Sequence, residues 1–179
     1  IVVLVIVVLL VLWFIGVNNA LVQLRNKVRN QFSQIDIQLK KRYDLIPNLV
    51  ETVKGYAKHE SETFEKVIAA RNSYATANTD AEKIESAGEL SKCVSRLLAV
   101  AEAYPDLKAN TNFLNLQEQL KEIEDKISYA RQFYNDSVMV YNNKIQMFPS
   151  SIVASMLKFK TEAFFQANEQ ERENVKVEF

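Results

Sequence analysis

The sequence contains few residues of the kinds that stop helices or build chemical sites. Three of its 179 residues are Gly and three are Pro, so few positions force a helix to end. The single cysteine, Cys93, excludes an intrachain disulfide framework and any metal site held by several cysteines. We therefore expect an all-α chain built from long helices.

The charge balance does not favour a polyanionic partner. Lys and Arg number 22, and Asp and Glu also number 22, so the formal net charge is zero. A domain that binds DNA or RNA through its phosphates usually carries a basic excess. We predict no nucleic-acid partner, and we interpret the run "KKR" at residues 40–42 as a solvated surface.

The residue types that catalyse reactions are also scarce. The single histidine, His59, stands in "HESET", which lacks the second histidine of the zinc-protease motif. A di-iron bundle needs Glu-x-x-His twice. Lys92 and Arg96 near Cys93 would favour a thiolate, but no base for a nucleophile is evident, and no Gly-rich phosphate loop is present. We predict no enzyme activity, no cofactor and no metal site.

The first 16 residues, "IVVLVIVVLLVLWFIG", contain no charged side chain. As a helix they would be about 25 Å long, close to the thickness of the hydrocarbon core of a bilayer, and Trp13 occupies the place of an interfacial aromatic. The alternative is a cleaved signal peptide, but no A-x-A-like site follows and helical periodicity continues through "GVNNALVQL". We predict a transmembrane anchor over residues 1–17, with the lipid bilayer as its partner.

The side of the membrane on which the body lies is left open. Arg25, Lys27 and Arg29 follow the apolar run and, taken alone, would place the body in the cytoplasm. The chain begins with Ile rather than Met, so we expect further residues upstream. Lysines there would reverse the orientation.

Apolar residues three and four apart continue from Leu21 to Ile46. This spacing predicts that the membrane helix extends into a stalk with one apolar face, which suits packing against a partner helix. We interpret part of this face as a candidate seam between copies of the chain, formed by Leu24, Val28, Phe32, Ile35 and Leu39.

Pro47, in "QLKKRYDLIPNLVETVKGYAKHE", interrupts this pattern. A proline inside a helix removes a hydrogen bond and clashes with the preceding turn. Asp44 lies three residues earlier, where its carboxylate would cap a new helix with Pro47 in the first turn, so the proline marks either a kink or a fresh start. We expect helices over about 18–45 and 47–76, with Asp44, Pro47 and Asn48 forming a structural junction.

The remaining helices have recognisable ends. Thr79 and Glu82 have capping-box spacing and predict a helix over about 80–104, which Pro105 ends. The long apolar stripe from Phe113 to Phe148 predicts a helix over about 110–148 with bundle-like crossings, and a short helix over 151–157 follows. Residues 18–158 would then form an antiparallel up-down bundle.

The tail, residues 159–179, differs from the body. Val175, Val177 and Phe179 alternate with charged residues, as in a half-buried strand or an extended arm. We interpret these three residues as a candidate partner-binding arm.

Three long segments of the chain resemble the bacterial LemA family: "IDIQLKKRYDLIPNLVETVKGYAKHE", "LLAVAEAYPDLKANTNFLNLQEQL" and "IEDKISYARQFYNDSVMVYNNKIQMFPSSIVA", followed by "FK" and "FF". The resemblance covers nearly the whole chain. One departure is "LKFK", where many members carry Gly-Phe, and it concerns the local turn. The resemblance implies a single-pass protein of the bacterial inner membrane with a long-helix bundle and no established enzyme function.

Two functions follow from these patterns. The first is a non-enzymatic, membrane-anchored helical scaffold of the cell envelope that forms a homo-oligomer. The alternative is an adaptor for a membrane protease or another envelope enzyme, which captures its partner through the arm or through an exposed helix groove.

Overall fold

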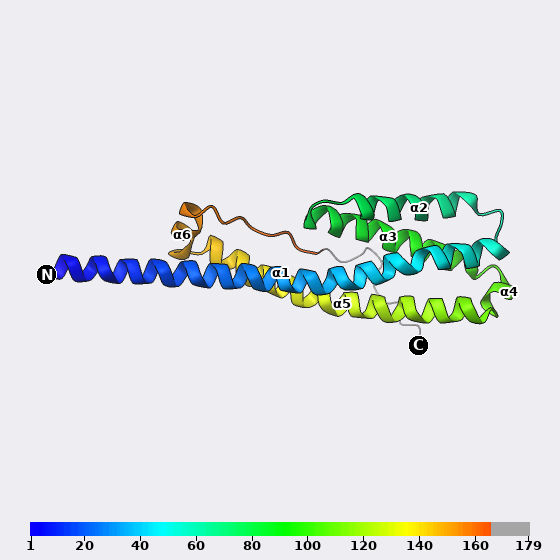
Figure 1. Ribbon diagram of the computed structural model, residues 1–179, viewed down its shortest axis with the longest axis horizontal. Helices are drawn as coiled ribbons and strands as arrows, with labels where there is room; N and C mark the ends of the chain where they lie inside the picture. The colour runs from blue at the N-terminus through cyan, green and yellow to red at the C-terminus, as the bar shows by residue number, and fades with distance from the viewer. Residues whose placement is uncertain (166–179) are drawn as a thin grey trace, which may run out of the picture. The chain divides into compact units, whose positions relative to one another are not determined.

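The computed structural model describes residues 1–165, and within that range the chain forms six helices and no strand (Figure 1). The all-α prediction is confirmed. The helices are α1 (Val2–Tyr56), α2 (Ser61–Thr76), α3 (Asp80–Ala101), α4 (Pro105–Lys108), α5 (Thr111–Gln146) and α6 (Ser150–Met156).

The described chain divides into two compact units that share the long helices α1 and α5. The first unit contains Ile1–Ile35 and Tyr129–Phe164. The second unit is built mainly from Asp36–Ser128. Each unit has its own buried residues.

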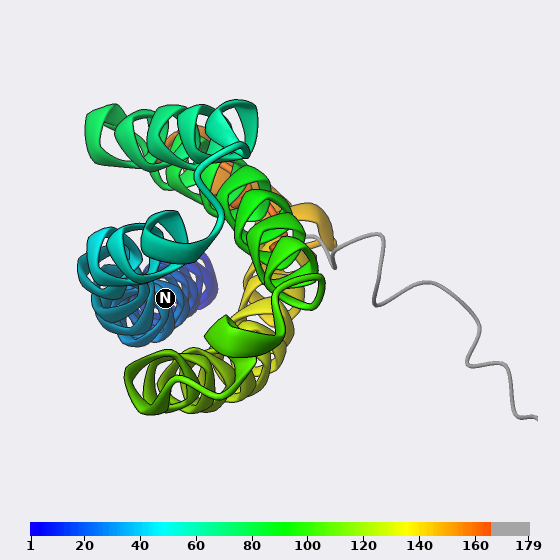
Figure 2. The ribbon, with the colours of Figure 1, turned by 90° about the vertical axis from the view of Figure 1, so that its right-hand side faces the viewer.

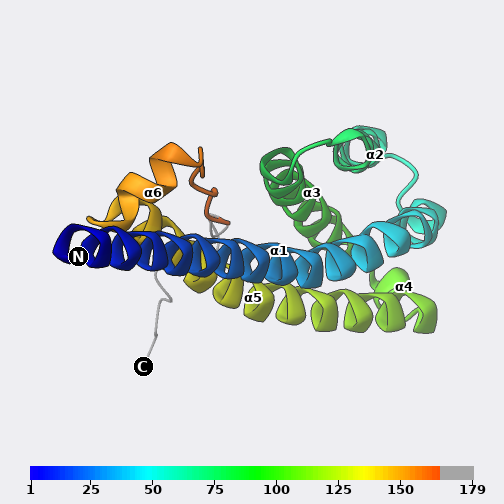
Figure 3. The same ribbon diagram turned by 60° about the vertical axis from the view of Figure 1, so that its left-hand side comes forward.

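In the first unit, α1 and α5 lie side by side with opposite chain directions (Figures 1 and 3). The rings of Phe32 and Tyr134 meet at a centroid distance of 5.8 Å. Nearer the N-terminus of α1, Val17 and Leu21 pack against Val153 and Ala154 of α6. Residues of one helix face thus contact α5 and α6 in turn, as their three- and four-residue spacing predicts.

The end of α6 is fixed by a Schellman motif. The N–H of Lys158 donates to the carbonyl of Ser155 at 3.1 Å, and the N–H of Phe159 donates to the carbonyl of Ala154 at 2.9 Å. Lys158 has φ 56°, the left-handed conformation that glycine adopts most easily. The departure "LKFK" therefore keeps the turn, at a conformational cost to Lys158.

The segment after α6 is tied to α5 by polar contacts. The side chain of Asn142 donates to the carbonyl of Glu162 and accepts from the N–H of Glu162, both at 2.9 Å. The hydroxyl of Tyr134 donates to the carbonyl of Ala163 at 2.9 Å. These bonds pair backbone N–H and C=O groups of a segment that belongs to no helix or strand.

In the second unit, α2 and α3 form a packed hairpin (Figure 2). The predicted capping box at the start of α3 is confirmed: the N–H of Glu82 donates to Thr79 Oγ1 at 3.2 Å, and the N–H of Thr79 donates to Glu82 Oε2 at 3.1 Å. The buried faces keep helical spacing, with Phe64, Val67, Ala70 and Tyr74 on α2 and Ala87, Leu90, Ser91, Val94, Leu97 and Ala101 on α3.

The predicted helix start at Pro47 is wrong. Helix α1 continues through Pro47 to Tyr56, and the chain leaves the helix at residues 57–60 instead. The proline therefore lies inside a helix, where Arg71 of α2 contacts the preceding turn.

Candidate functional site: an exposed apolar helix and buried arginine contacts

The N-terminal end of α1 exposes nearly all of its apolar side chains. Every residue from Ile1 to Leu12 is at least 49% exposed, and Ile15 is 48% exposed. This helix is long and apolar enough to cross a membrane. Soluble monomeric proteins rarely leave so large an apolar surface in water, so lipid is the environment that suits it.

The residues interpreted as a seam between copies are mostly covered within the chain. Val28, Phe32, Ile35 and Leu39 are 6% exposed or less, and Leu24 is half-buried. The ring of Phe32 contacts Tyr134 of α5. The periodicity predicts the apolar face correctly, but it cannot predict that the same chain covers this face. Because α5 covers it, the face is not open to a second copy in this structure.

The residues interpreted as a junction lie on one continuous helix. Asp44 is exposed and forms a surface ion pair with Lys40 at 3.1 Å. The carbonyl of Asn48 accepts from Thr52 Oγ1 at 2.8 Å. Neither side chain caps a new helix.

Arg71 of α2 explains how α1 accommodates Pro47. Because proline has no N–H, the carbonyl of Tyr43, four residues earlier, loses its helical donor. Arg71 Nε donates to that carbonyl at 3.4 Å, and the Arg71 guanidinium lies 3.9 Å from the centre of the Tyr43 ring. One side chain from α2 thus replaces the missing donor and adds a cation–π contact.

Tyr43 also borders a polar network in the second unit. The ring of Tyr43 lies 5.9 Å from the ring of Tyr74, whose hydroxyl donates to Asp36 Oδ1 at 3.1 Å. Lys83 donates to the same oxygen at 3.2 Å. Burial, together with the negative charge of Asp36, raises the pKa of Tyr74 well above its ordinary value, so this phenol remains a donor at neutral pH.

Arg42 is the residue that the sequence interpretation placed incorrectly. The run "KKR" predicts a solvated side chain at this position, but Arg42 is 2% exposed. Its Nη1 donates to Ser91 Oγ at 2.5 Å and to Glu124 Oε2 at 2.9 Å, and its Nη2 donates to the carbonyl of Ala87 at 2.9 Å. Arg42 therefore connects α1 to α3 and α5.

A sequence signal for this burial was present. Arg42 lies three residues after Leu39 and four before Ile46, and both of these are buried, so it occupies a position of the apolar face. A cavity of about 440 Å³ adjoins the cluster, lined by Arg42, Ser91, Val94, Ser95, Leu98, Gln117, Leu120, Lys121, Glu124 and Asp125.

A groove of about 820 Å³ runs between α2 and α3, lined by Thr63, Lys66, Ala69, Ala70, Ser73, Glu89, Lys92, Cys93, Ser95, Arg96 and Ala99. Burial, and next the charge of Glu89, raise the pKa of the Cys93 thiol. The surroundings of Cys93 therefore disfavour the thiolate that Lys92 and Arg96 would favour.

The other sequence candidates give no constellation of reactive groups. His59 is exposed in the turn after α1. Across residues 1–165, no group of three or more His, Cys, Asp or Glu side chains is placed to hold a metal ion. Val175, Val177 and Phe179, the candidate partner-binding arm, lie outside the described residues.

Comparison with known proteins places the chain in a family. Residues 31–179 match the model of the LemA family. The chain belongs to the LemA family. Its relatives include Protein LemA of Metamycoplasma hominis, which is 29% identical over 163 residues covering 90% of this chain and 74% of the relative.

Two further relatives are named magnetosome proteins. Magnetosome protein MamQ 2 of Paramagnetospirillum magneticum is 32% identical over 79 residues, which cover 44% of this chain and 29% of that protein. Magnetosome protein MamQ of Magnetospirillum gryphiswaldense is 23% identical, with coverage of 82% of this chain and 64% of that protein. The chain thus spans less than two thirds of the length of these MamQ proteins.

The family of the chain and its exposed apolar helix both bear on where the protein lies in the cell. The LemA family is not a known family of enzymes. The helix that suits lipid and the family to which the chain belongs together indicate a membrane-associated protein.

Proposed function

We propose that this chain is a non-enzymatic helical scaffold of the bacterial cell envelope, anchored by a single pass through the inner membrane and assembled into a homo-oligomer. The observation that carries the proposal is the continuity of α1 from Val2 to Tyr56. Up to Leu12 its apolar side chains are exposed, while from Val17 onwards the same helix buries one face. One helix therefore carries both the segment that we propose as the lipid anchor and residues that pack in the body.

The outer face of α5 supports self-association. Tyr129, Phe133 and Val140 are 68%, 59% and 47% exposed, and they fall at spacings of four and seven residues, which places them on one face of the helix. We call these three residues the α5 stripe. An exposed stripe with this spacing is suited to helix-to-helix contact with a second copy, whereas the buried residues of α1 are not.

Analytical ultracentrifugation of the full chain in detergent tests the assembly. The wild type is expected to sediment as an oligomer, and the double variant Phe133→Glu, Val140→Glu is expected to sediment as a monomer because two carboxylates oppose burial of the stripe. Gln132→Glu is the matched control, an exposed change on the same helix, and should leave the oligomer intact. A wild type that remains strictly monomeric at high concentration would refute the assembly.

The adaptor alternative is favoured by the groove between α2 and α3. Its lining is rich in small residues, among them Ala69 and Ala99, which are exposed, and small residues allow close approach of a partner helix. Filling the groove with Ala69→Trp should then release an envelope enzyme that co-purifies with the wild type, without changing the oligomer. An unchanged complex would count against the adaptor function.

A further inference from the structure

The α5–α6 turn and α6 carry a second cluster of exposed apolar side chains, separate from the apolar run of α1. Its members are Met147, Phe148, Ile152, Met156 and Leu157, which are 64%, 80%, 50%, 66% and 43% exposed. We call these five residues the α6 patch. They fall within eleven consecutive positions of the chain, and exposed apolar side chains that gather in this way mark a site of interaction.

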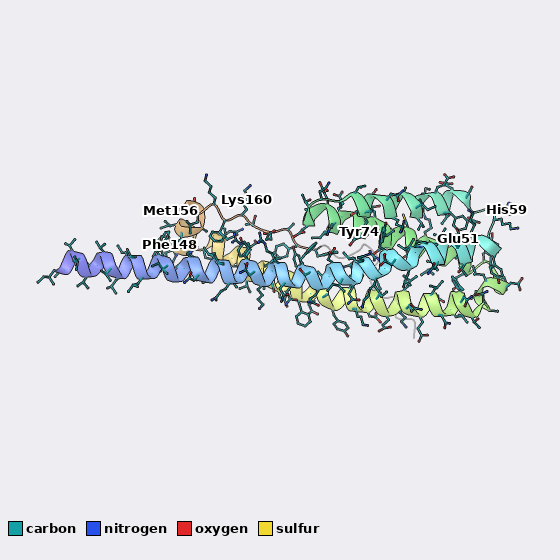
Figure 4. All side chains as sticks on the ribbon, in the orientation of Figure 1. Glu51, His59, Tyr74, Phe148, Met156 and Lys160 are labelled. Carbon is teal, nitrogen blue, oxygen red and sulfur yellow. The ribbon has the colours of Figure 1, made fainter. Side chains whose placement is uncertain are left out.

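The opposite side of α6 holds the patch next to the end of the apolar run. Val153 and Ala154 pack against Val17 and Leu21 of α1, and Phe14 packs against the same cluster. Val17 comes directly after the 16-residue apolar run, so α6 lies at the level where a helix crossing the bilayer would leave it. Figure 4 shows Phe148 and Met156 close to this part of α1.

The charged residues nearest to the patch along the chain are basic. Residues 137–161 contain Lys144, Lys158 and Lys160 and no Asp or Glu, and residues 1–35 contain Arg25, Lys27 and Arg29 and no Asp or Glu. Lys158 and Lys160 are exposed. In Figure 4, Lys160 lies farther from the N-terminal end of α1 than Phe148 and Met156 do, so apolar residues lie toward the span and a basic residue lies away from it.

We propose that the α6 patch enters the boundary between headgroups and acyl chains of the bilayer that α1 crosses, giving the chain a second contact with the same membrane. This inference rests on the proposed anchoring by α1. A short helix with an apolar outer side flanked by lysines has the composition of an interfacial helix. The lysines reach lipid phosphates while their stems stay along the apolar boundary.

Continuity with the span is the reason that lipid, and not a soluble protein, is the occupant. If α1 crosses the bilayer with residues 1–16, the contacts of Phe14 and Val17 with the α6 cluster hold the patch at the surface from which α1 emerges. An apolar patch at that depth meets acyl chains without any further partner.

Two membrane contacts would restrict the body more than one. A single helix in a bilayer is free to rotate about its axis and to tilt. A second contact beside it fixes the rotation of the first unit and therefore sets which helix faces are presented to neighbouring copies.

Quenching of tryptophan fluorescence by brominated lipid tests this contact in the full chain. Trp13 is the single tryptophan, so a Trp13→Phe background allows one new tryptophan at a time. Phe148→Trp reports on the patch. Gln132→Trp is the matched control, an exposed position on α5 outside the α5 stripe that lies about 21 Å along the helix axis from the end of α5. Circular dichroism checks that each variant keeps its helices.

The proposal predicts that lipids brominated near the headgroup quench the emission of the Phe148→Trp variant at least twofold, with a blue shift, and leave the Gln132→Trp variant unquenched. If the Phe148→Trp variant is as insensitive to brominated lipid as the Gln132→Trp variant, while Trp13 of the wild type is quenched, the α6 contact is overturned and the anchor stays in place. A blue shift without quenching would overturn the contact too, since it would place the introduced indole against protein. An unquenched Trp13 would overturn the anchor and, with it, this inference.

Discussion

Arg42 shows how one residue decides the packing of the second unit. Its guanidinium donates to a serine, a carboxylate and a helix carbonyl on two other helices. A buried arginine of this kind is stable only while these partners are present, because an unpaired charge away from water is costly. The planar fork of arginine matches the arrangement, and a lysine has one nitrogen for the same task.

Replacing Arg42 should destabilise the fold in proportion to the bonds that are lost. Arg42→Ala is expected to lower the free energy of unfolding by about 3 kcal/mol, the lower end of the range for breaking a buried pair, because Glu124 is 40% exposed and regains water. Arg42→Lys should lose an intermediate amount. Chemical unfolding of the full chain in detergent, followed by circular dichroism, measures both.

Lys41→Ala is the control for the cluster, since Lys41 is exposed beside Arg42. It should change the free energy of unfolding by no more than about 0.5 kcal/mol. Equal effects of the two alanine variants would contradict the role given to Arg42.

Glu82 gives the chain a pH dependence at low pH. The backbone N–H groups of Asn78 and Thr79 bond to its carboxylate and lower its pKa below the ordinary value of 4.5. A carboxyl whose pKa is lowered by folding stabilises the fold above its unfolded pKa, and this contribution disappears as the pH falls through the folded pKa. The capping box should therefore be strongest at neutral pH.

Glu82→Gln isolates this effect. The wild type should be more stable than the variant at pH 7, and the difference should shrink as the pH falls from about 5 to about 3. Thermal unfolding at a series of pH values measures the difference, and Glu85→Gln, an exposed change on the same helix, serves as the control. A difference that stays constant across this range would contradict the assigned cause.

At the level of the elements, α1 persists through Pro47 because α2 supplies a donor. The carbonyl of Tyr43 is left without its helical partner, and Arg71 bonds to it and stacks on the Tyr43 ring. A proline in a helix interior ordinarily costs about 3 kcal/mol. The contact with α2 offsets part of that cost, so α1 and α2 are energetically coupled at this point.

A double-mutant cycle measures the coupling. Arg71→Ala is expected to cost about 1.5 kcal/mol in the wild-type background, through the lost hydrogen bond and cation–π contact. With Pro47→Ala, the new N–H at position 47 donates to Tyr43, so Arg71→Ala should cost about 0.5 to 1 kcal/mol less. Arg96→Ala, an exposed arginine on α3, should show no coupling with Pro47→Ala. Strictly additive effects of Pro47→Ala and Arg71→Ala would contradict the compensation.

These elements also show what the sequence could predict. Helical periodicity and the Thr79 capping box are local signals, and they predicted the all-α fold and the start of α3. Pro47 is local too, but Arg71, which lies 24 residues later, decides whether the helix survives it. The spacing of Arg42 from Leu39 and Ile46 indicated its burial, but its partners Ser91, Glu124 and Ala87 lie on distant segments. The covering of Phe32 by Tyr134 is also a contact between distant segments, which spacing along one helix cannot specify.

Over the whole chain the formal net charge is zero, but basic and acidic residues are distributed unevenly between the two units. The first unit, which contains the exposed apolar helix, carries seven Lys and Arg and two Asp and Glu, so the acidic excess lies in the rest of the chain. Basic residues beside an apolar span favour anionic lipid headgroups. The unit that we propose to meet the membrane is also the one whose charge suits it.

We expect α1 to anchor the chain in a bilayer and to stay attached to the body. Alkaline carbonate extraction of membranes from cells that express the full chain, with mass spectrometry of the extracted and retained protein, tests this most directly. The chain should stay in the membrane pellet with residues 1–16 intact. A protein released into the supernatant, or one whose N-terminus begins after Gly16, would contradict it.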